Sequence, residues 1–385
     1  MKIGCCLAYY KNHNNYGTSL QGYSTVKVLQ TLVHEVRIIK YIKNDCFLRK
    51  LQIAPLQLIS GGYKAYIRKI KKVNMAKKTG QYAVNMRIRT DANNRFKDEN
   101  MEGLCDEYIG YKNLQKGAFN YDAVMVGSDQ VWTPLGLYSN FFNLRFVADQ
   151  IRKISYASSF GVSVIPFWQR SATCKFLNRI DFLSVREIKA KEIVDFISCK
   201  KAHVVCDPTL LRTREEWIKE FEKNSPKAKG DYIFCYLLGD NIEVRTEITR
   251  FANAKGMEIV TLRHTDEYIE CDETFGDKSP YDVNPMDFLQ LINNAKYVFT
   301  DSFHCCVFST LFNKQFVTFY RFCNSSTNSR NSRIDSFLSI FGLENRLFSG
   351  DLLKQVDMDI DYKSVNAKIT DFREESLKFL QNALK

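Results

Sequence analysis

The sequence predicts an α/β protein built from two Rossmann-like domains that face a cleft. Apolar runs of strand length alternate with helical patterns along most of the chain, which is typical of parallel α/β architecture. The strand–helix units recur on both sides of residue ~205, and 385 residues suffice for two domains of roughly 150–200 residues each. We therefore expect a first domain over 1–205, a second over 206–365 and a terminal helix over 366–385.

The first half opens with a strand-like run, a turn-rich segment and an amphipathic helix. The expected elements are strands at 2–10, 35–42, 121–129, 152–161, 179–187 and 202–211, and helices at 20–34 and 188–198. A basic segment interrupts this series, and we expect a helical insertion in the first domain over 46–118.

The second half begins with a helix start signal, because Thr213 and Glu216 have the spacing of a capping box. Strands are expected at 231–240, 257–264, 297–301 and 315–320, with helices at 241–255 and 306–314 between them. Asn284 followed by Pro285 marks the start of a further helix, since Asn caps helices and Pro fits the first turn.

Composition excludes several classes of protein. Gly (18) and Pro (7) are too scarce for a collagen-like or linker-dominated chain, and no apolar run approaches the roughly 18–20 residues of a membrane span. The N-terminus shows no cleavage site of small residues, so no signal peptide is expected. The 12 cysteines are scattered, without a CxxC pair, which indicates reduced thiols, no metal site and a cytoplasmic protein.

The charge is unevenly distributed. The net charge is +12, and the segment between Asp45 and Asp91 carries 11 basic residues and no acidic one. Such a patch suits an anionic partner, and nucleic acid is not expected because no binding module accompanies it. Within it, 67–78 alternates apolar with basic residues, as an interfacial amphipathic helix does. We predict that 46–90 brings the first domain into peripheral contact with the anionic inner face of the cytoplasmic membrane. Alternatively, the same basic residues bind an acidic polysaccharide or only keep the protein soluble.

Candidate site residues are expected where strands end and helices begin, because ligands of open parallel sheets bind there. In the segment 297–313 a strand ends at Asp301, and His304 follows at the mouth of a helix, whose free amides and dipole favour an anion. A histidine there can bind phosphate or carboxylate and can exchange a proton near neutral pH. A half-buried His304 that only packs against Phe303 and Phe308 is the alternative.

Two further strand ends carry polar side chains. Ser128, Asp129 and Gln130 follow one strand and suit the hydroxyls of a sugar, with Trp132 available to stack on its ring. A turn with capping side chains explains the same residues. The small hydroxylic run 155–161 is a weaker signal, and Arg186 offers a fork to phosphate or carboxylate unless it forms a surface ion pair.

Nucleotide and metal signatures are missing from the sequence. It contains no GxxxxGK[ST], no GxGxxG after a strand, no HExxH and no DxDxDG. The turn from Asn15 to Thr18 holds one glycine, which is too little for a dinucleotide site. We expect neither a bound cofactor nor a metal.

Taken in order, these segments closely resemble the polysaccharide pyruvyl transferase family. The resemblance rests on NYGTSLQ, YDAVMVGSDQVW, SYASSFG, SVREI, DPTLL and NPMDFLQLINNAKYVFTDSFHCCVFSTLF, and it spans roughly 1–345. It implies a glycosyltransferase-B-like fold and transfer of pyruvate from phosphoenolpyruvate to sugar hydroxyls, which gives a cyclic ketal on a bacterial surface polysaccharide, such as an exopolysaccharide or capsule, or on its lipid-linked precursor. Phosphoenolpyruvate is then a co-substrate.

The resemblance also implies roles for particular residues. His304 matches the donor-site histidine of the family, and Arg186 falls where the family places a donor-binding arginine. Two positions depart from the pattern: some members have Arg where this chain has Ser302, and Cys305 replaces a residue that is usually Gly or another small one. Arg321 or Arg333 can supply the missing charge, and we favour Arg333 because its Asn/Ser-rich loop can reach the ligand.

The resulting hypothesis assigns two sets of residues. Donor-binding residues are Arg186, Ser302, Phe303, His304, Arg321 and Arg333; acceptor-binding residues are Asn15, Gly17, Ser128, Asp129, Gln130, Trp132 and Ser158. His304 is the expected acid or phosphate donor, and Asp129 orients or deprotonates the sugar hydroxyl. A glycosyltransferase that uses a nucleotide sugar on the same fold is the alternative, and a carbohydrate-binding scaffold without activity is a third hypothesis.

Overall fold

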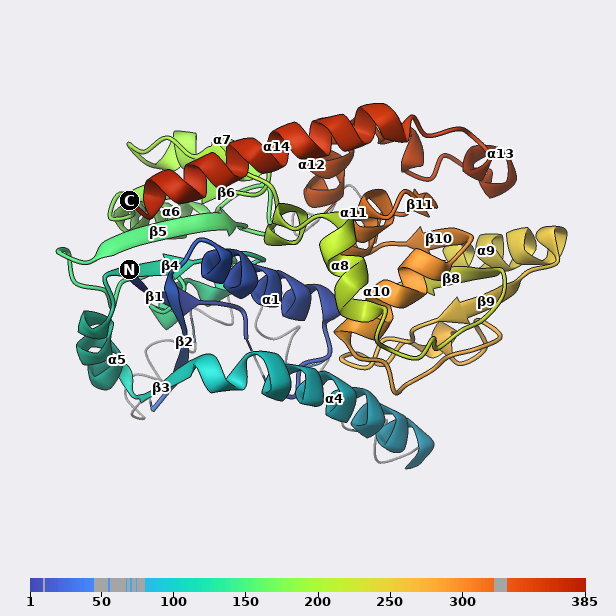
Figure 1. Ribbon diagram of the computed structural model, residues 1–385, viewed down its shortest axis with the longest axis horizontal. Coiled ribbons are helices and arrows are strands. Elements are labelled where there is room, and N and C mark those ends of the chain that lie inside the picture. Colours follow the sequence, from blue (N-terminus) through green and yellow to red (C-terminus); the bar gives the residue numbers. More distant parts are fainter. Residues whose placement is uncertain are drawn as a thin grey trace.

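The computed structural model describes residues 1–9, 11–44, 80–321 and 331–385, with four isolated positions at 55, 67, 70 and 74. Within these ranges the chain forms two separate parallel β-sheets flanked by helices (Figure 1). This confirms the predicted α/β class with two Rossmann-like sheets.

The first sheet has seven strands. They are β1 (Lys2–Cys6), β2 (Glu35–Ile42), β3 (Cys105–Ile109), β4 (Ala123–Val126), β5 (Arg152–Ser158), β6 (Phe182–Val185) and β7 (His203–Val204). Their order is β3-β2-β1-β4-β5-β6-β7, and every neighbouring pair is parallel. Because the chain leaves β1 toward one edge and returns at β4 toward the other, the order reverses between β1 and β4, where open α/β sheets bind ligands.

The second sheet has four parallel strands in the order β11-β10-β8-β9. These are β8 (Tyr232–Tyr236), β9 (Glu258–Thr261), β10 (Tyr297–Thr300) and β11 (Gln315–Thr318). Its order reverses between β8 and β10. The strands are short and fully buried at their centres, as expected for sheets covered by helices on both faces.

Twelve α-helices of the described ranges connect or cover the strands. They are α1 (Tyr16–Thr31), α4 (Gly80–Asn100), α5 (Tyr111–Gly117), α6 (Phe167–Leu177), α7 (Ile188–Ile197), α8 (Arg214–Phe221), α9 (Ile242–Lys255), α10 (Pro285–Asn294), α11 (Phe303–Leu311), α12 (Ser332–Phe341), α13 (Leu352–Val356) and α14 (Tyr362–Ala383). The predicted caps are present: Thr213 and Glu216 form the capping box of α8, and Asn284 caps α10 with Pro285 in its first turn.

Several expected elements differ from the structure, and the strand expected over 202–211 is only His203–Val204, followed by a 3₁₀ helix at Pro208–Leu211. The insertion predicted as helical over 46–118 contains β3 at its end, where Cys105–Ile109 pairs with β2 as the edge strand of the first sheet. The terminal helix begins at Tyr362 rather than at 366, because Asp361 accepts a hydrogen bond from the Ser364 amide and caps it there. The domain boundaries themselves stay a prediction.

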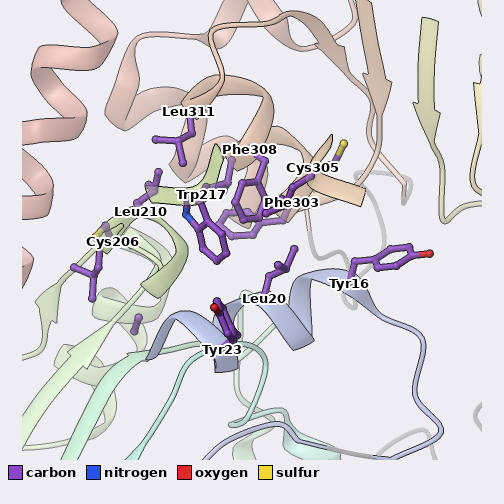
Figure 2. Close-up of a cluster of buried hydrophobic side chains, with 14 of the residues drawn as sticks. Tyr16, Leu20, Tyr23, Cys206, Leu210, Trp217, Phe303, Cys305, Phe308 and Leu311 are labelled. Atoms are coloured by element: carbon purple, nitrogen blue, oxygen red, sulfur yellow. The ribbon is translucent and has the colours of Figure 1, made fainter. Parts of the chain in front are cut away.

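The two halves share a hydrophobic core. Side chains from α1, including Tyr16, Leu20 and Tyr23, belong to one buried cluster with Trp217 of α8 and Phe308 of α11 (Figure 2). The aromatic ring of Tyr16 stacks on Phe288 of α10 at a centroid distance of 4.7 Å, although Phe288 belongs to the second half. Helix α1 therefore packs against residues from both halves of the chain.

The terminal helix also joins the halves. Figure 1 shows α14 running from α13, beyond the second sheet, back along the molecule toward α6 and β5. Its Ser376 hydroxyl accepts a hydrogen bond from the Cys206 amide, and its last residue, Ala383, accepts one from Arg152. The chain thus ends beside the sheet with which it begins.

The basic segment is described only in part. Nine of its 11 basic residues, including all those of 67–78, lie outside the described residues, so its predicted membrane contact stays a prediction. The prediction of an exposed basic patch is wrong for Arg89 on α4. Arg89 is buried, and its guanidinium donates to the carbonyls of Pro280 and Tyr281 in the second half. Arg89 is consequently an interdomain contact and does not contribute to an exposed basic face.

Two predictions from composition can be compared with the described residues. None of the helices in the described ranges is long and apolar enough to cross a membrane. The ten cysteines that lie in those ranges are all free thiols, and most of them are buried, which agrees with the expected reduced state.

Candidate functional site

Five charged or titratable side chains meet where the strand ends of the two sheets face each other. Asp129 follows β4, Arg186 follows β6, Asp207 follows β7, His304 lies in the first turn of α11 after β10, and Arg333 lies in the first turn of α12. We call these five residues the strand-end site. The predicted cleft between the sheets is bridged here by direct contacts, since His304, after β10 of the second sheet, lies 3.6 Å from Asp207, after β7 of the first sheet.

Asp207 is held from several sides. Its Oδ1 accepts hydrogen bonds from the amide (3.0 Å) and hydroxyl (2.7 Å) of Thr209, because Asp207 caps the short 3₁₀ helix Pro208–Leu211. Its Oδ2 faces Arg186 Nη1 at 2.7 Å, the Ser128 hydroxyl at 3.2 Å and His304 Nε2 at 3.6 Å. Burial alone would raise the pKa of Asp207, but His304, Arg186 and Thr209 hold it well below its usual range. Asp207 is therefore a buried anion.

Arg186 is a fixed and buried cation. Its Nε donates to Glu187 at 3.0 Å and its Nη1 to Asp207, while the guanidinium carbon lies 4.3 Å from the ring centroid of Phe303. Burial lowers the pKa of Arg186, but Glu187, Asp207 and Asp129 raise it above its usual value. Nη2 is buried and has no hydrogen-bond partner among the described residues, so one donor of the fork remains for a ligand.

His304 lies between helix α1 and the 3₁₀ helix that Asp207 caps. Its side chain is 8 % exposed, and Nε2 is fully buried, faces Asp207 and makes no hydrogen bond to a described residue. The Nδ1 edge lies against Gly17 of α1: a Cβ added to Gly17 would stand 2.1 Å from Nδ1. Only glycine leaves room for the imidazole in this position.

Asp129 occupies a left-handed backbone conformation with φ of 73° directly after Ser128. Its Oδ1 accepts the Gln130 amide at 2.8 Å, and its Oδ2 accepts the hydroxyl of Thr18, in the first turn of α1, at 2.7 Å. Burial raises the pKa of Asp129, but His304, Arg186 and Thr18 together lower it below its ordinary value. An ionised Asp129 is better suited to accept a hydrogen bond from a ligand than to remove its proton.

Two more arginines approach from the second half. Arg333 is half-buried, and its guanidinium carbon lies 5.9 Å from the Phe303 ring, the same ring that Arg186 covers. Burial and the nearby Arg186 and Arg321 lower the pKa of Arg333 to about 9. Since cations crowd there, a bound anion would relieve their repulsion. Arg321 donates to the backbone and carboxylate oxygens of Asp301, which in turn accepts the amides of the loop after β8.

The structure brings together most of the predicted donor residues. His304, Arg186, Phe303 and Arg333 are in one cluster, and Ser302 immediately precedes them as the N-cap of α11, without a side-chain hydrogen bond to the helix. Arg321 pairs with Asp301, whereas Arg333 lies near the Phe303 ring with Arg186. What each residue binds stays a prediction.

The predicted acceptor residues separate into three groups. Asp129 belongs to the strand-end site. Asn15, Gly17 and Gln130 adjoin it: Asn15 caps α1, Gly17 contacts His304, and Gln130 packs against Gly161. Ser128 and Ser158 are fully buried behind it, where the Ser128 hydroxyl binds Asp207 and Ala157, and the Ser158 hydroxyl accepts from Ser155.

Trp132 contradicts the expected sugar stacking. It is 5 % exposed, its indole nitrogen donates to the Phe142 carbonyl at 3.0 Å, and its ring packs on Phe160 and Phe176. Because the Trp132 amide bonds to the Ser159 carbonyl, the chain turns inward there and the indole enters the core. Trp132 is thus a core residue in this structure.

Asp207, Thr18 and Glu187 also belong to the site and were not predicted from the sequence. Asp207 lies in DPTLL, which was noted only for the family resemblance, and Thr18 lies in NYGTS, of which only Asn15 and Gly17 were predicted as site residues. A carboxylate followed by proline after a strand was a usable signal, since Asp caps the turn that follows and also faces the sheet edge. No group of His, Cys, Asp and Glu that could hold a metal ion occurs among the described residues.

The fold and the site define a two-sheet α/β protein with arginines and a histidine gathered at facing strand ends. The sequence profile of the family described as "Polysaccharide pyruvyl transferase" matches residues 15–321, which include four of the five strand-end residues. The chain belongs to the polysaccharide pyruvyl transferase family, and this membership supports a transferase.

Solved structures with a similar chain path are distant. The UDP-GlcNAc 2-epimerase of Methanocaldococcus jannaschii, solved with UDP-GlcNAc and UDP, is 14% identical with a TM-score of 0.49, covering 99% of this chain and 100% of its own. Anabaena HepE, solved with UDP and glucose, is 8% identical (TM-score 0.47; 99% and 100%). The E. coli ADP-heptose lipopolysaccharide heptosyltransferase II is 11% identical (TM-score 0.39; 97% and 99%). No curated protein matches the chain in sequence.

Proposed function

We propose that this protein transfers pyruvate from phosphoenolpyruvate to two hydroxyls of a sugar, forming a cyclic ketal during the synthesis of a bacterial surface polysaccharide. The observation that carries the proposal is the pair of arginines, Arg186 and Arg333, on one aromatic ring beside His304 at a helix N-terminus. Phosphoenolpyruvate carries a phosphate and a carboxylate close together, so a binding site for it needs at least two cations and several donors.

The donor would lie against the first turn of α11. Ser302 does not use its side chain to cap this helix, which leaves the first amides for an anion. Arg186 offers its unbonded Nη2, and Arg333 offers a cation whose pKa is lowered by burial and by its neighbouring arginines. Ser302 then replaces the arginine of some family members without loss of charge, because Arg333 supplies it.

The reaction balances with the two substrates alone. Protonation of C3 makes C2 electrophilic, a sugar oxygen bonds to C2, the bond between C2 and the phosphate oxygen breaks, and the second sugar oxygen closes the ring. Of the two hydroxyl protons, one ends in the new methyl group and the other on the released phosphate. His304 is the proposed acid, and Asp129 is the proposed acceptor for a hydrogen bond from the attacking hydroxyl. We expect no bound cofactor and no metal, because arginines neutralise the phosphate.

The test incubates the protein with phosphoenolpyruvate and a panel of lipid-linked saccharides. A saccharide whose mass increases by one pyruvyl group, with one phosphate released for each, supports the proposal. His304→Gln should lose about 10²-fold or more in turnover, whereas His203→Gln, an exposed histidine on β7, should keep wild-type turnover. Transfer from a UDP- or GDP-sugar, without any reaction of phosphoenolpyruvate, would instead identify a glycosyltransferase.

The proposed acceptor is lipid-linked, which places the enzyme in the cytoplasm at the inner face of the membrane. The basic segment 46–90 is the proposed contact, with about 1 kcal/mol for each basic residue near an anionic surface. Wild-type protein should sediment with anionic vesicles at low salt and be released at high salt. Replacing Lys69, Lys71, Lys72, Lys77 and Lys78 with Gln should abolish sedimentation but leave turnover on a soluble acceptor; sedimentation of the substituted protein would contradict the membrane contact.

A further inference from the structure

The orientation of the His304 ring is fixed by two neighbours beside the first sheet, Asp207 after β7 and Gly17 in α1. Nε2 points at Asp207, with 3.6 Å between the nitrogen and Oδ2, and the Nδ1 edge rests on the backbone of Gly17. The two nitrogens therefore have different surroundings. Nε2 is fully buried, and Nδ1 lies at the first turn of α1, next to Thr18 and its partner Asp129.

Asp207 itself cannot turn away from His304. Its Oδ1 is held by two hydrogen bonds from Thr209, and Arg186 fixes Oδ2 at 2.7 Å. The same oxygen that binds Arg186 faces Nε2, so one carboxylate aligns both the proposed phosphate ligand and the proposed acid. An ionised carboxylate accepts hydrogen bonds but donates none, so it favours a proton on Nε2.

We infer that Asp207 is a positioning residue for His304, which keeps the Nε2 proton directed at itself and makes Nδ1 the nitrogen that exchanges a proton with the donor. The identity of the donor rests on the proposed function; the pairing of the two residues does not. In the reaction, protonated His304 gives the Nδ1 proton to C3 of phosphoenolpyruvate, where the new C–H bond forms, and takes one back from the attacking sugar hydroxyl. The 3.6 Å separation shortens to a hydrogen bond when the site is loaded, as catalytic contacts often do.

Other charges near the ring do not replace Asp207 in this role. Asp129 and Arg333 face the same space, and Arg186 with its partner Glu187 lies behind Asp207. Asp301 is turned to Arg321 and to the loop after β8. Among the ion pairs of the described ranges, Asp207 is the one carboxylate within 4.0 Å of His304. Removing its charge should hence change the protonation of His304 more than removing any of the others.

Glu187 provides a matched control. It is buried to the same degree as Asp207 and also binds Arg186, at 3.0 Å, but it has no contact with His304 among those of the described residues. Asp207→Asn and Glu187→Gln both weaken the hold on Arg186 and should both raise KM for phosphoenolpyruvate. We expect only Asp207→Asn to lower kcat, by about 10²-fold, and to shift the pH–rate profile.

The direct test is nitrogen NMR on protein labelled with ¹⁵N-histidine. The chain has only five histidines, so His304→Gln assigns the resonances of His304 by difference. Wild-type protein should show neutral His304 as the Nε2–H tautomer. In Asp207→Asn the neutral ring should lose its single tautomer, whereas Glu187→Gln should leave the tautomer unchanged.

Each outcome decides the inference. An Nδ1–H tautomer in wild type overturns it without any variant, which matters if Asp207→Asn does not fold. The same His304 tautomer in the two variants, or an equal loss of kcat, reduces Asp207 to a structural partner of Arg186. If phosphoenolpyruvate is not turned over at all but the tautomer and its dependence on Asp207 are as expected, the proposed function fails while the pairing stands.

Discussion

Gly17 makes the contact that is most sensitive to a single added atom. The substitution Gly17→Ala puts a Cβ 2.1 Å from His304 Nδ1 and 2.3 Å from Cγ, whereas ordinary contacts of a Cβ begin at 3.4 Å. The imidazole or the first turn of α1 must therefore move by at least 1.3 Å. Misplacing a reacting group by about 1 Å costs roughly 10²-fold in rate, so we expect kcat to fall by about that factor.

Stability should change much less than activity. Alanine is favoured over glycine inside a helix by about 1 kcal/mol, and overpacking a filled site costs about 1–3 kcal/mol. These two effects oppose each other, so the free energy of unfolding should fall by less than about 2 kcal/mol. Phosphate release measures the first quantity, and urea unfolding measures the second.

Gly22→Ala is the control on the same helix. Its added Cβ would come closest to the end of the Met101 side chain, at 3.2 Å, which can move aside, and would meet Leu7 Cδ1 at an ordinary 3.8 Å. We expect wild-type turnover and equal or slightly greater stability for this variant. Turnover of Gly17→Ala within twofold of wild type would refute both the placement of His304 against α1 and its role as the acid.

Three further results are expected. Inorganic phosphate at about 100 times its Kd should raise Tm by about 3 °C, and Arg333→Gln should lose most of this shift; equal shifts in both proteins would remove Arg333 from the anion site. Because the pKa of Asp207 is lowered in the folded protein, its contribution to stability is present above about pH 4 and lost as the pH falls through the lowered value. In urea unfolding at a series of pH values, Asp207→Asn should cost about 3 kcal/mol at pH 7 and progressively less below pH 4, and a cost independent of pH would contradict the buried anion. Trp132→Phe leaves the Phe142 carbonyl unpaired and should cost about 1–3 kcal/mol of stability with an unchanged KM for the saccharide, whereas a raised KM would restore Trp132 to the acceptor site.

The sequence was sufficient to predict where the site lies, because that follows from strand ends. Periodicity locates the ends of parallel strands, and the carboxyl ends of one sheet share an edge, so His304, Arg186 and Asp129 were expected at facing edges. For Trp132, the expectation of an exposed ring at the same strand end was wrong. Its position three residues after Asp129 does not reveal that the Trp132 amide bonds to the Ser159 carbonyl and that the indole is directed into the core.

The contacts of Asp207 and Gly17 with His304 could not be predicted in this way, for different reasons. Asp207 follows β7, a strand of only two residues, and its importance comes from meeting His304 across 97 positions of the chain. Such a contact depends on how the two sheets approach each other, which no local pattern contains. Gly17 was predicted as a site residue because it lies in a turn. The structure requires glycine there because the backbone of α1 comes close to the His304 imidazole from the other half.

The way in which α1 and α14 cross between the halves restricts how hybrid enzymes can be built from this family. A crossover at residue 205 would join a foreign second half to an α1 whose Tyr16 stacks on Phe288 and donates a hydrogen bond to the Val283 carbonyl. It would also supply a foreign α14, although Ala383 at its end must accept a hydrogen bond from Arg152. Hybrids that exchange only the segment 206–361, and that keep the residues facing Tyr16 and Gly17, preserve these contacts between the halves. The two halves of different family members can consequently be recombined only where the residues that contact the first turn of α1 are kept.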